Sequence, residues 1–211
     1  MIAVQSRHVQ ERMRHIEGSA LVDFAALYEE SVELVSVALP LSAAVTAAAS
    51  QLLSHSGLQA QWVQDSSANE LRTDGRPASV NEALRVLRED ISTPVEVLQE
   101  LLGCESCGVR VKVLEGPMCP RFHVDKVPCR MLMTYLGEGT EWIAHDDCDF
   151  TAMGSDTPPL LQHCAIKQLK PGTWSLLKGG QWFEGYGGVV HRSPSCKERR
   201  LLVSIDPIFS D

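Results

Sequence analysis

The chain has 211 residues, a formal charge of −8 and 44% hydrophobic residues. This apolar content argues against disorder, and the length allows one domain with an extension or at most two small domains. The longest apolar run, residues 35–49, contains Pro40 and is shorter than the roughly 20 apolar residues that a membrane span needs. The chain does not start with a secretory signal pattern, so we expect a cytoplasmic protein whose seven cysteines are thiols or ligands.

Charge and cysteine are distributed unevenly and divide the chain into three parts. Residues 1–18 form a polar stretch that we expect to be a flexible tail. Residues 19–105 carry 4 basic and 13 acidic side chains, whereas residues 106–211 carry 12 of each and six of the seven cysteines, Cys104 lying just before them. The acidic part lacks the clustered Lys and Arg that bind phosphate backbones or anionic membranes. We therefore expect neither nucleic acid nor a membrane as a partner.

The acidic part, residues 19–105, is expected to be mainly helical. Its predicted elements are a strand over residues 31–38, an Ala-rich helix over 41–54, a polar loop over 57–76 and two helices that begin near 79 and 93. Both of the later helix starts carry the capping-box pattern S/T-x-x-E, and Gly103 ends the second helix.

The last part, residues 106–211, changes to the period of a β-strand. Val109, Val111 and Val113 alternate with charged residues, which is typical of a half-buried strand. Further strands are predicted over residues 121–127, 129–136, 140–143, 164–169, 173–177, 188–191 and 200–205. Short strands with Gly and Pro turns and no helices between them indicate a sandwich, barrel or jelly roll. We expect an α+β protein in which the helical part packs on this barrel as one integrated domain.

The densest chemical signal is the segment 119–130, CPRFHVDKVPCR. His123 and Asp125 are two residues apart on a predicted strand, so their side chains should leave the same face. With a second histidine they would form the 2-His-1-carboxylate set that binds Fe(II) and leaves positions open. His191, at the end of a late strand, can supply it, and Arg200 follows nine residues later. A guanidinium there can bind a carboxylate beside the metal.

In this order, HxD, a distal His and an Arg resemble the Fe(II)/2-oxoglutarate-dependent dioxygenase superfamily over residues 108–207. The resemblance implies a double-stranded β-helix, a jelly-roll or cupin-like barrel, with Fe(II) held by His123, Asp125 and His191. It also implies 2-oxoglutarate bound through Arg200, with Tyr135 as the aromatic near this co-substrate. The activity implied is hydroxylation of a substrate C–H bond, with a lid formed by residues 144–162. A small molecule and a protein both stay open as the substrate.

The amino-acid sequence of several segments also resembles an uncharacterised bacterial domain-of-unknown-function family, number 1826, from about residue 21 to the end. The segments are CPRFHVDKVPCR, TYLGEGTEW, LLKG, VVHRSP and RRLLVSID. That resemblance carries no reaction, but it links the chain to metal homeostasis. The alternative function is therefore a cupin-like protein that binds zinc or iron without oxygenase activity. A structural barrel with a vestigial site is a third hypothesis.

Two groups of residues keep more than one interpretation. Arg199, Arg192 and Arg130 compete with Arg200 as binders of a co-substrate carboxylate. Cys104 and Cys107 form a C-x-x-C pair, which is either half of a zinc site or two reduced, partly buried thiols.

Overall fold

The computed structural model of the chain describes residues 12–65, 75–195 and 197–209. Its strands form a seven-stranded sheet of order β1-β2-β8-β5-β10-β4-β3 and a three-stranded sheet of order β7-β6-β9. The large sheet contains β1 (Arg14–Gly18), β2 (Val32–Val37), β3 (Gln59–Asp65), β4 (Ser106–Leu114), β5 (Cys129–Leu136), β8 (Trp174–Lys178) and β10 (Arg200–Ile208). The small sheet contains β6 (Glu141–Ile143), β7 (Lys167–Gln168) and β9 (Val190–Arg192).

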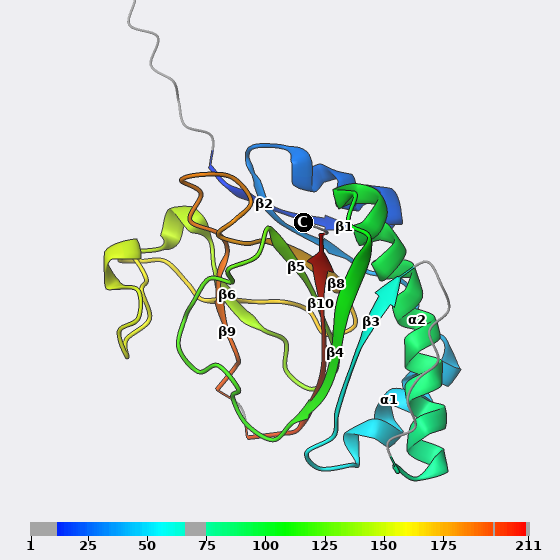
Figure 1. Ribbon diagram of the computed structural model, residues 1–211. Helices are drawn as coiled ribbons and strands as arrows, with labels where there is room; N and C mark the ends of the chain where they lie inside the picture. The colour runs from blue at the N-terminus through cyan, green and yellow to red at the C-terminus, as the bar shows by residue number, and fades with distance from the viewer. Residues whose placement is uncertain (1–11, 66–74, 196, 210–211) are drawn as a thin grey trace, which may run out of the picture.

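Helices cover one side of the large sheet, and the small sheet lies on its other side (Figure 1). The helices are α1 (Ala43–Leu53) and α2 (Ala78–Leu102), with short 3-10 helices η1 (Leu21–Tyr28), η2 (His145–Asp147) and η3 (Phe150–Ala152). Ser42 caps α1 by accepting a hydrogen bond from the amide of Val45. The chain is therefore a mixed α+β protein. In the part of the chain that the structure describes, no helix is both long and apolar enough to cross a membrane.

Strand alternation separates two apolar layers. Val109, Val111 and Val113 of β4 point to the helix side and belong to the main core with Leu84 and Leu87 of α2. The opposite face of the large sheet meets the small sheet in a second core, formed by Leu34, Leu132, Trp142, Ala144, Leu169, Leu177 and Val189. Side chains on this second face are the ones that can reach a site between the sheets.

A single helix, α2, replaces the two helices predicted to begin near 79 and 93. Pro94, which should have marked a new start, is buried inside α2. The apolar stripe of α2 continues through Ile91 and Val95 to Leu98, all buried in the main core. Burial of this continuous stripe outweighs the hydrogen bond that proline removes, so tertiary packing overrides the local signal.

Three further segments differ from the sequence-based expectations. Residues 14–18, expected in a flexible tail, form β1 and pair with β2 in parallel, while residues 1–11 of that tail lie outside the described residues. The predicted loop over 57–76 is wrong at its start, because β3 pairs with β4, and residues 66–74 are not described. The expectation of a mainly helical part 19–105 is thus met only by α1 and α2. Residues 121–127 form no regular strand, only a bridge at His123.

The strand β10 lies between β5 and β4 and runs antiparallel to both. Leu201, Val203 and Ile205 point to the helix side, so Arg200 and Asp206 share the face toward the small sheet. These two charged residues are both buried, at 2% and 8% exposure. Their burial between the sheets calls for specific partners.

Candidate metal centre

Two histidines and one aspartate converge where the segment before β5 meets β9. The backbones of His123 and His191 exchange two hydrogen bonds, in which each amide N donates to the other residue's carbonyl O at 3.0 Å. Their ring centroids are 4.5 Å apart. Asp125 brings its carboxylate to the same place, so one ligand atom from each of the three residues lies within 4.8 Å of the others. The structure thus brings together the three residues that the sequence proposed as metal ligands.

Glycines allow the segment that carries His123 and Asp125 to pack this closely. Gly188 has a φ of +76°, and a Cβ at this position would lie 2.4 Å from Cγ1 of Val124. A Cβ on Gly179 would lie 2.0 Å from a backbone carbonyl oxygen of the same segment. Any other residue at these two positions would push the segment away from β9.

Hydrogen bonds outside the cluster orient both imidazoles. Nδ1 of His123 lies 3.0 Å from the carbonyl O of Arg121, and Nδ1 of His191 lies 3.0 Å from that of Val189. Because a carbonyl oxygen only accepts, we assign the proton to Nδ1 in both rings, which leaves the lone pair on Nε2. Histidines that bind metals are oriented in this way by a partner on the other ring nitrogen.

The donor atoms of the cluster suit a cation. Nε2 of His191 lies 3.2 Å from Oδ2 of Asp125, and Nε2 of His123 lies 3.8 Å from Oδ1. Oδ2 is buried, and among the described residues no well-aligned donor gives it a hydrogen bond. Two lone pairs and a carboxylate oxygen that face one another need a positive charge between them. Two imidazoles and a carboxylate fit a transition metal and leave coordination positions free.

The protonation states agree with this arrangement. Burial, and then the charge of nearby His191, lowers the pKa of His123, which keeps its ring neutral at neutral pH. Burial acts to raise the pKa of Asp125, but the proximity and charge of His191 and the charge of Arg130 outweigh it and lower the pKa to about 2. A neutral imidazole and an ionised carboxylate, the states that these shifts favour for His123 and Asp125, are the forms that bind metal ions.

Arg200 is almost completely buried, at 2% exposure. Its Nη2 donates to Oγ of Ser193 at 3.1 Å, and its Nη1 donates to the carbonyl O of Glu138 at 3.3 Å. Ser193 follows His191 by two residues, so this hydrogen bond links Arg200 to the segment that carries a proposed metal ligand. A guanidinium can bind a carboxylate through two parallel hydrogen bonds.

The competing arginines are engaged elsewhere. Nε of Arg192 donates to Glu141 at 2.6 Å, and Arg199 is exposed and pairs with Glu115 at 2.9 Å. Arg130 pairs with Asp125 itself, at 2.7 Å. The register of β10 turns Arg200 inward and Arg199 outward.

Tyr135 is not brought to the metal cluster. It lies on the helix-facing side of β5, opposite to Arg130, and its ring meets Trp174 edge-on in the main core. Its hydroxyl donates to Oδ2 of Asp90 in α2 at 2.5 Å. The strand alternation that aims Arg130 between the sheets aims Tyr135 away from them. This placement corrects the assignment of Tyr135 to the co-substrate.

Substitution Tyr135→Phe should therefore affect stability and not the co-substrate. The variant loses the donor to the half-buried Asp90, so we expect the free energy of unfolding to fall by about 1–3 kcal/mol. Urea unfolding measures this change, and titration of the metal-loaded variant with 2-oxoglutarate should give the wild-type Kd. A weakened Kd at unchanged stability would restore the role first assigned to Tyr135.

The C-x-x-C pair lies in the main core. Sγ of Cys104 and Sγ of Cys107 are 3.8 Å apart, and both residues are buried on the helix side of the sheet. Burial, followed by the neighbouring Cys104, raises the pKa of the Cys107 thiol well above its ordinary value. A protonated, buried thiol agrees with the interpretation as reduced cysteines rather than as half of a zinc site. Cys196 lies outside the described residues.

Glu33 of β2 is a buried acid that the sequence did not indicate. The register of β1 and β2 shifts at Glu33, which is the extra residue of a β-bulge. Its side chain is fully buried, and Oε2 accepts a hydrogen bond from the backbone N of His145 at 3.0 Å. Burial raises the pKa of Glu33 to about 7. The bulge thus fixes the start of the segment 144–162, which was predicted to be a lid.

The shifted pKa of Glu33 makes stability depend on pH. The folded protein binds the Glu33 proton more tightly than the unfolded chain, in which the pKa of a glutamate is near its ordinary value of 4.5. Its contribution is therefore complete below pH 4.5 and is lost as the pH rises to about 7, by about 3 kcal/mol. Urea unfolding at pH 5 and pH 8 should show this loss in the wild type and in a Glu29→Gln control, but not in Glu33→Gln. Equal losses in all three proteins would contradict the shifted pKa.

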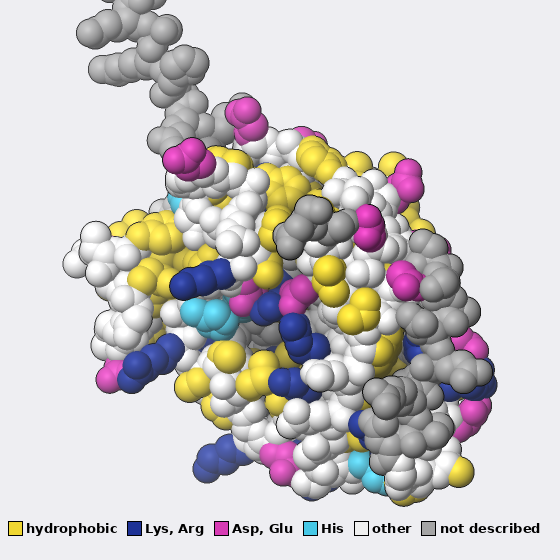
Figure 2. Space-filling model, viewed as in Figure 1, with side chains coloured by type: hydrophobic (Ala, Val, Ile, Leu, Met, Phe, Trp, Pro, Cys, Tyr) yellow, Lys and Arg dark blue, Asp and Glu magenta, His cyan; other side chains and the backbone are white. Residues whose placement is uncertain are grey.

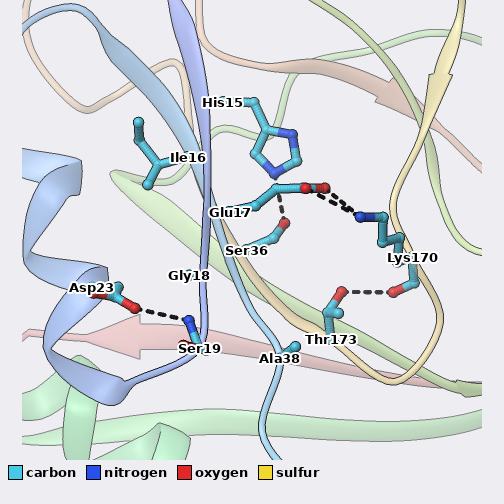
Figure 3. A pocket seen from close by; sticks show the side chains of 10 residues that line it. All are labelled: His15, Ile16, Glu17, Gly18, Ser19, Asp23, Ser36, Ala38, Lys170 and Thr173. Atoms are coloured by element: carbon cyan, nitrogen blue, oxygen red, sulfur yellow. Dashed lines mark hydrogen bonds and ion pairs between the residues drawn. The ribbon is translucent and has the colours of Figure 1, made fainter.

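A separate cavity of about 430 Å³ lies between β1 and the turn that precedes β8. Figure 3 shows that its charged and polar side chains pair with one another, Glu17 with Lys170 and His15 with Ser36. The carboxylate of Asp23 accepts from the amides of Ser19 and Ala20. These polar groups of the cavity already have partners. The cavity therefore offers a ligand fewer unpaired polar atoms than the His/Asp/His cluster does.

Figure 2 shows one face of the molecule, on which histidine, acidic and basic side chains gather near the centre of the view, the region where β9, β5 and β10 lie in Figure 1. Of the three proposed ligands, His123 and Asp125 are partly exposed, whereas His191 is buried. The sequence missed Asp206, Glu33 and Ser193 as members of this region. The alternation of β10 could have placed Asp206 on the face of Arg200, but nothing in the sequence signals the bulge at Glu33.

The arrangement of the sheets is shared with solved oxygenases at low sequence identity. The rice dioxygenase for auxin oxidation gives a TM-score of 0.60 at 13% identity, covering 93% of this chain and 83% of that one. A Pseudomonas putida prolyl-4-hydroxylase gives 0.53 at 11% identity, covering 90% and 99%. A protein of the 2OG-Fe(II) oxygenase family from Caulobacter crescentus gives 0.53 at 11% identity, covering 94% and 87%. The fold is therefore that of the Fe(II)/2-oxoglutarate oxygenases.

The sequence itself places the chain more narrowly. Residues 18–206 match the family described as protein of unknown function, DUF1826. The chain belongs to this family, as the wording of its segments indicated. A comparison with curated proteins gave no match.

Proposed function

We propose that the chain is a non-haem, metal-dependent oxidoreductase of the Fe(II)/2-oxoglutarate hydroxylase type. The observation that carries this proposal is the convergence of His123, Asp125 and His191 to within 4.8 Å in a chain with this fold. In this proposal the two facing sheets form a double-stranded β-helix, a jelly-roll or cupin-like barrel. The metal cluster lies at its mouth and Arg200 lies deeper inside.

Three residues would bind the metal, and a fourth would bind the co-substrate. Fe(II) would be held by Nε2 of His123, Nε2 of His191 and the carboxylate of Asp125, and Arg200 would bind the far carboxylate of 2-oxoglutarate. The bound metal, with 2-oxoglutarate as electron donor, would supply the activation of O₂. The chain itself fixes the imidazole tautomers, keeps Asp125 ionised and lines the interior with apolar groups such as Trp142, which excludes water. We further propose that the protein acts in the cytoplasm and that its substrate is a small molecule or a protein.

The ligand set also supports a second candidate. Two histidines and one acidic residue with an open position are a known zinc set as well. The alternative is therefore a zinc or iron binding protein in metal homeostasis, without oxygenase activity. Zinc would use the same three ligands but would not need Arg200.

One experiment separates the two candidates without knowledge of the substrate. The purified protein is analysed for metal, stripped, reloaded with Fe(II) under anaerobic conditions and titrated with 2-oxoglutarate. The oxygenase proposal expects a visible charge-transfer band on binding and release of succinate after air is admitted. A protein that is isolated with zinc, and that shows neither the band nor succinate when loaded with Fe(II), would support the alternative.

A further inference from the structure

The carboxylate of Asp125 forms an ion pair with Arg130, which the sequence suggested only as a binder of a co-substrate carboxylate. Nη1 of Arg130 lies 2.7 Å from Oδ1 of Asp125. On its other side, Nε and Nη2 of Arg130 donate to the two oxygens of Asp206 at 2.6 and 2.9 Å. A guanidinium has a rigid planar fork, so this bidentate contact fixes the plane in which Nη1 meets Asp125.

Asp206 has a second cationic partner in Arg110, whose Nη1 donates to its Oδ2. The groups thus alternate in charge from Arg110 through Asp206 and Arg130 to Asp125. Arg130 lies on β5, Asp206 on β10 and Arg110 on β4, which are consecutive strands of the large sheet. Side chains anchored on three paired strands are held more rigidly than side chains on a loop. Asp125 itself lies outside the strands and depends on this support.

We propose that Arg130, braced by Asp206, is a positioning residue that makes Asp125 a one-oxygen metal ligand. Oδ1 is occupied by the guanidinium, so only Oδ2, which faces Nε2 of His191 at 3.2 Å, is left for the metal. Asp206 also neutralises Arg130, which would otherwise repel a metal ion beside it. This inference rests on the proposed metal site but not on the oxygenase reaction.

The expected effect is on metal affinity and on coordination geometry. Partners that orient a metal ligand typically contribute 10- to 100-fold in affinity, so Arg130→Met should weaken Co(II) binding by about that factor. Freed from the guanidinium, Asp125 can bind through both oxygens, and the visible spectrum of the Co(II) protein should change. Arg130→Lys keeps the charge but not the fork and should restore the affinity only in part. Asp206→Asn should weaken Co(II) binding because it leaves the Arg130 charge uncompensated.

Arg192→Met is the matched control. Arg192 is also a partly buried arginine paired with a carboxylate, Glu141, at 2.6 Å, and side-chain exposures of 17% and 20% resemble those of Arg130 and Asp206. Arg192 neighbours His191 in sequence, but its carboxylate partner is Glu141 and not the proposed ligand Asp125. The control should therefore keep the Co(II) affinity and spectrum of the wild type.

Each outcome decides the inference. Wild-type Co(II) affinity and spectrum in folded Arg130→Met would overturn it, as would a loss of 2-oxoglutarate binding with metal binding intact, which would make Arg130 an anion binder. If Arg130→Met does not fold, Asp206→Asn decides, and its wild-type affinity and spectrum would equally overturn the inference. A wild-type protein that binds no metal at all would instead remove the proposed function.

Discussion

Substitution Asp125→Ala should weaken the binding of Fe(II) or Co(II) by more than about 100-fold and should abolish succinate formation. The change removes the only anionic ligand of the proposed set. It also leaves the guanidinium of Arg130, which contacts this carboxylate at 2.7 Å in the wild type, as a positive charge beside the metal position. Loss of the anionic ligand and loss of one of the two carboxylate partners of Arg130 both disfavour a cation at this position, so both effects act in the same direction.

Isothermal titration with Co(II) under anaerobic conditions measures this loss, and thermal unfolding checks that the variant is folded. Asp156→Ala serves as control because the exposed carboxylate of Asp156 pairs with the guanidinium of Arg121 at 2.8 Å, whereas His123 is oriented by the backbone carbonyl of Arg121. His123→Ala and His191→Ala should each give a loss of the same order. Unchanged metal content in any of these three variants would remove that residue from the proposed ligand set.

Substitution Arg200→Met should leave metal binding intact but weaken the binding of 2-oxoglutarate roughly 30- to 4,000-fold, which corresponds to about 2–5 kcal/mol for one partner of a buried charge pair. The reason is the position of Arg200, which is almost completely buried and hydrogen-bonded to Ser193, two residues after His191. A carboxylate that enters this buried environment loses its hydration, and without the guanidinium no ion pair compensates for that loss.

Titration of the Fe(II) protein with 2-oxoglutarate, followed by the charge-transfer band, gives the Kd directly. Arg199→Met is the matched control, because Arg199 precedes Arg200 but is exposed and pairs with Glu115. Wild-type affinity in folded Arg200→Met would show that another group binds the distal carboxylate. It would leave the metal site itself untouched.

Local patterns predicted the elements whose sequence carries a clear strand or helix signal. The valines of β4, the strand at 32–37 and the helix at 43–53 lie where the sequence placed them. Failures occurred where a distant partner decides the conformation. Pro94 suggested a break, but the core keeps α2 continuous, and β3 reads as a loop until β4 supplies its hydrogen bonds.

The same distinction applies to the site. His123, Asp125, His191 and Arg200 could be proposed because their order and spacing match a known pattern, and the structure brings the first three together. The support of Asp125 could not be predicted in the same way, because Arg130 and Asp206 are 76 residues apart and meet only through the pairing of β5 with β10. Tyr135 shows the opposite error, since the motif was matched but the face of the strand was not.

The position of β10 also determines when the site can exist during synthesis. This strand follows all the other strands in the chain, yet it lies between β5 and β4 near the centre of the large sheet. Until it leaves the ribosome, β4 and β5 have unpaired edges, and the nascent chain lacks both Arg200 and Asp206. The proposed metal site can therefore take its native geometry only late, once β10, the last strand among the described residues, has been inserted between β5 and β4. Ribosome-bound chains that end before residue 200 should expose two neighbouring strand edges that chaperones can bind.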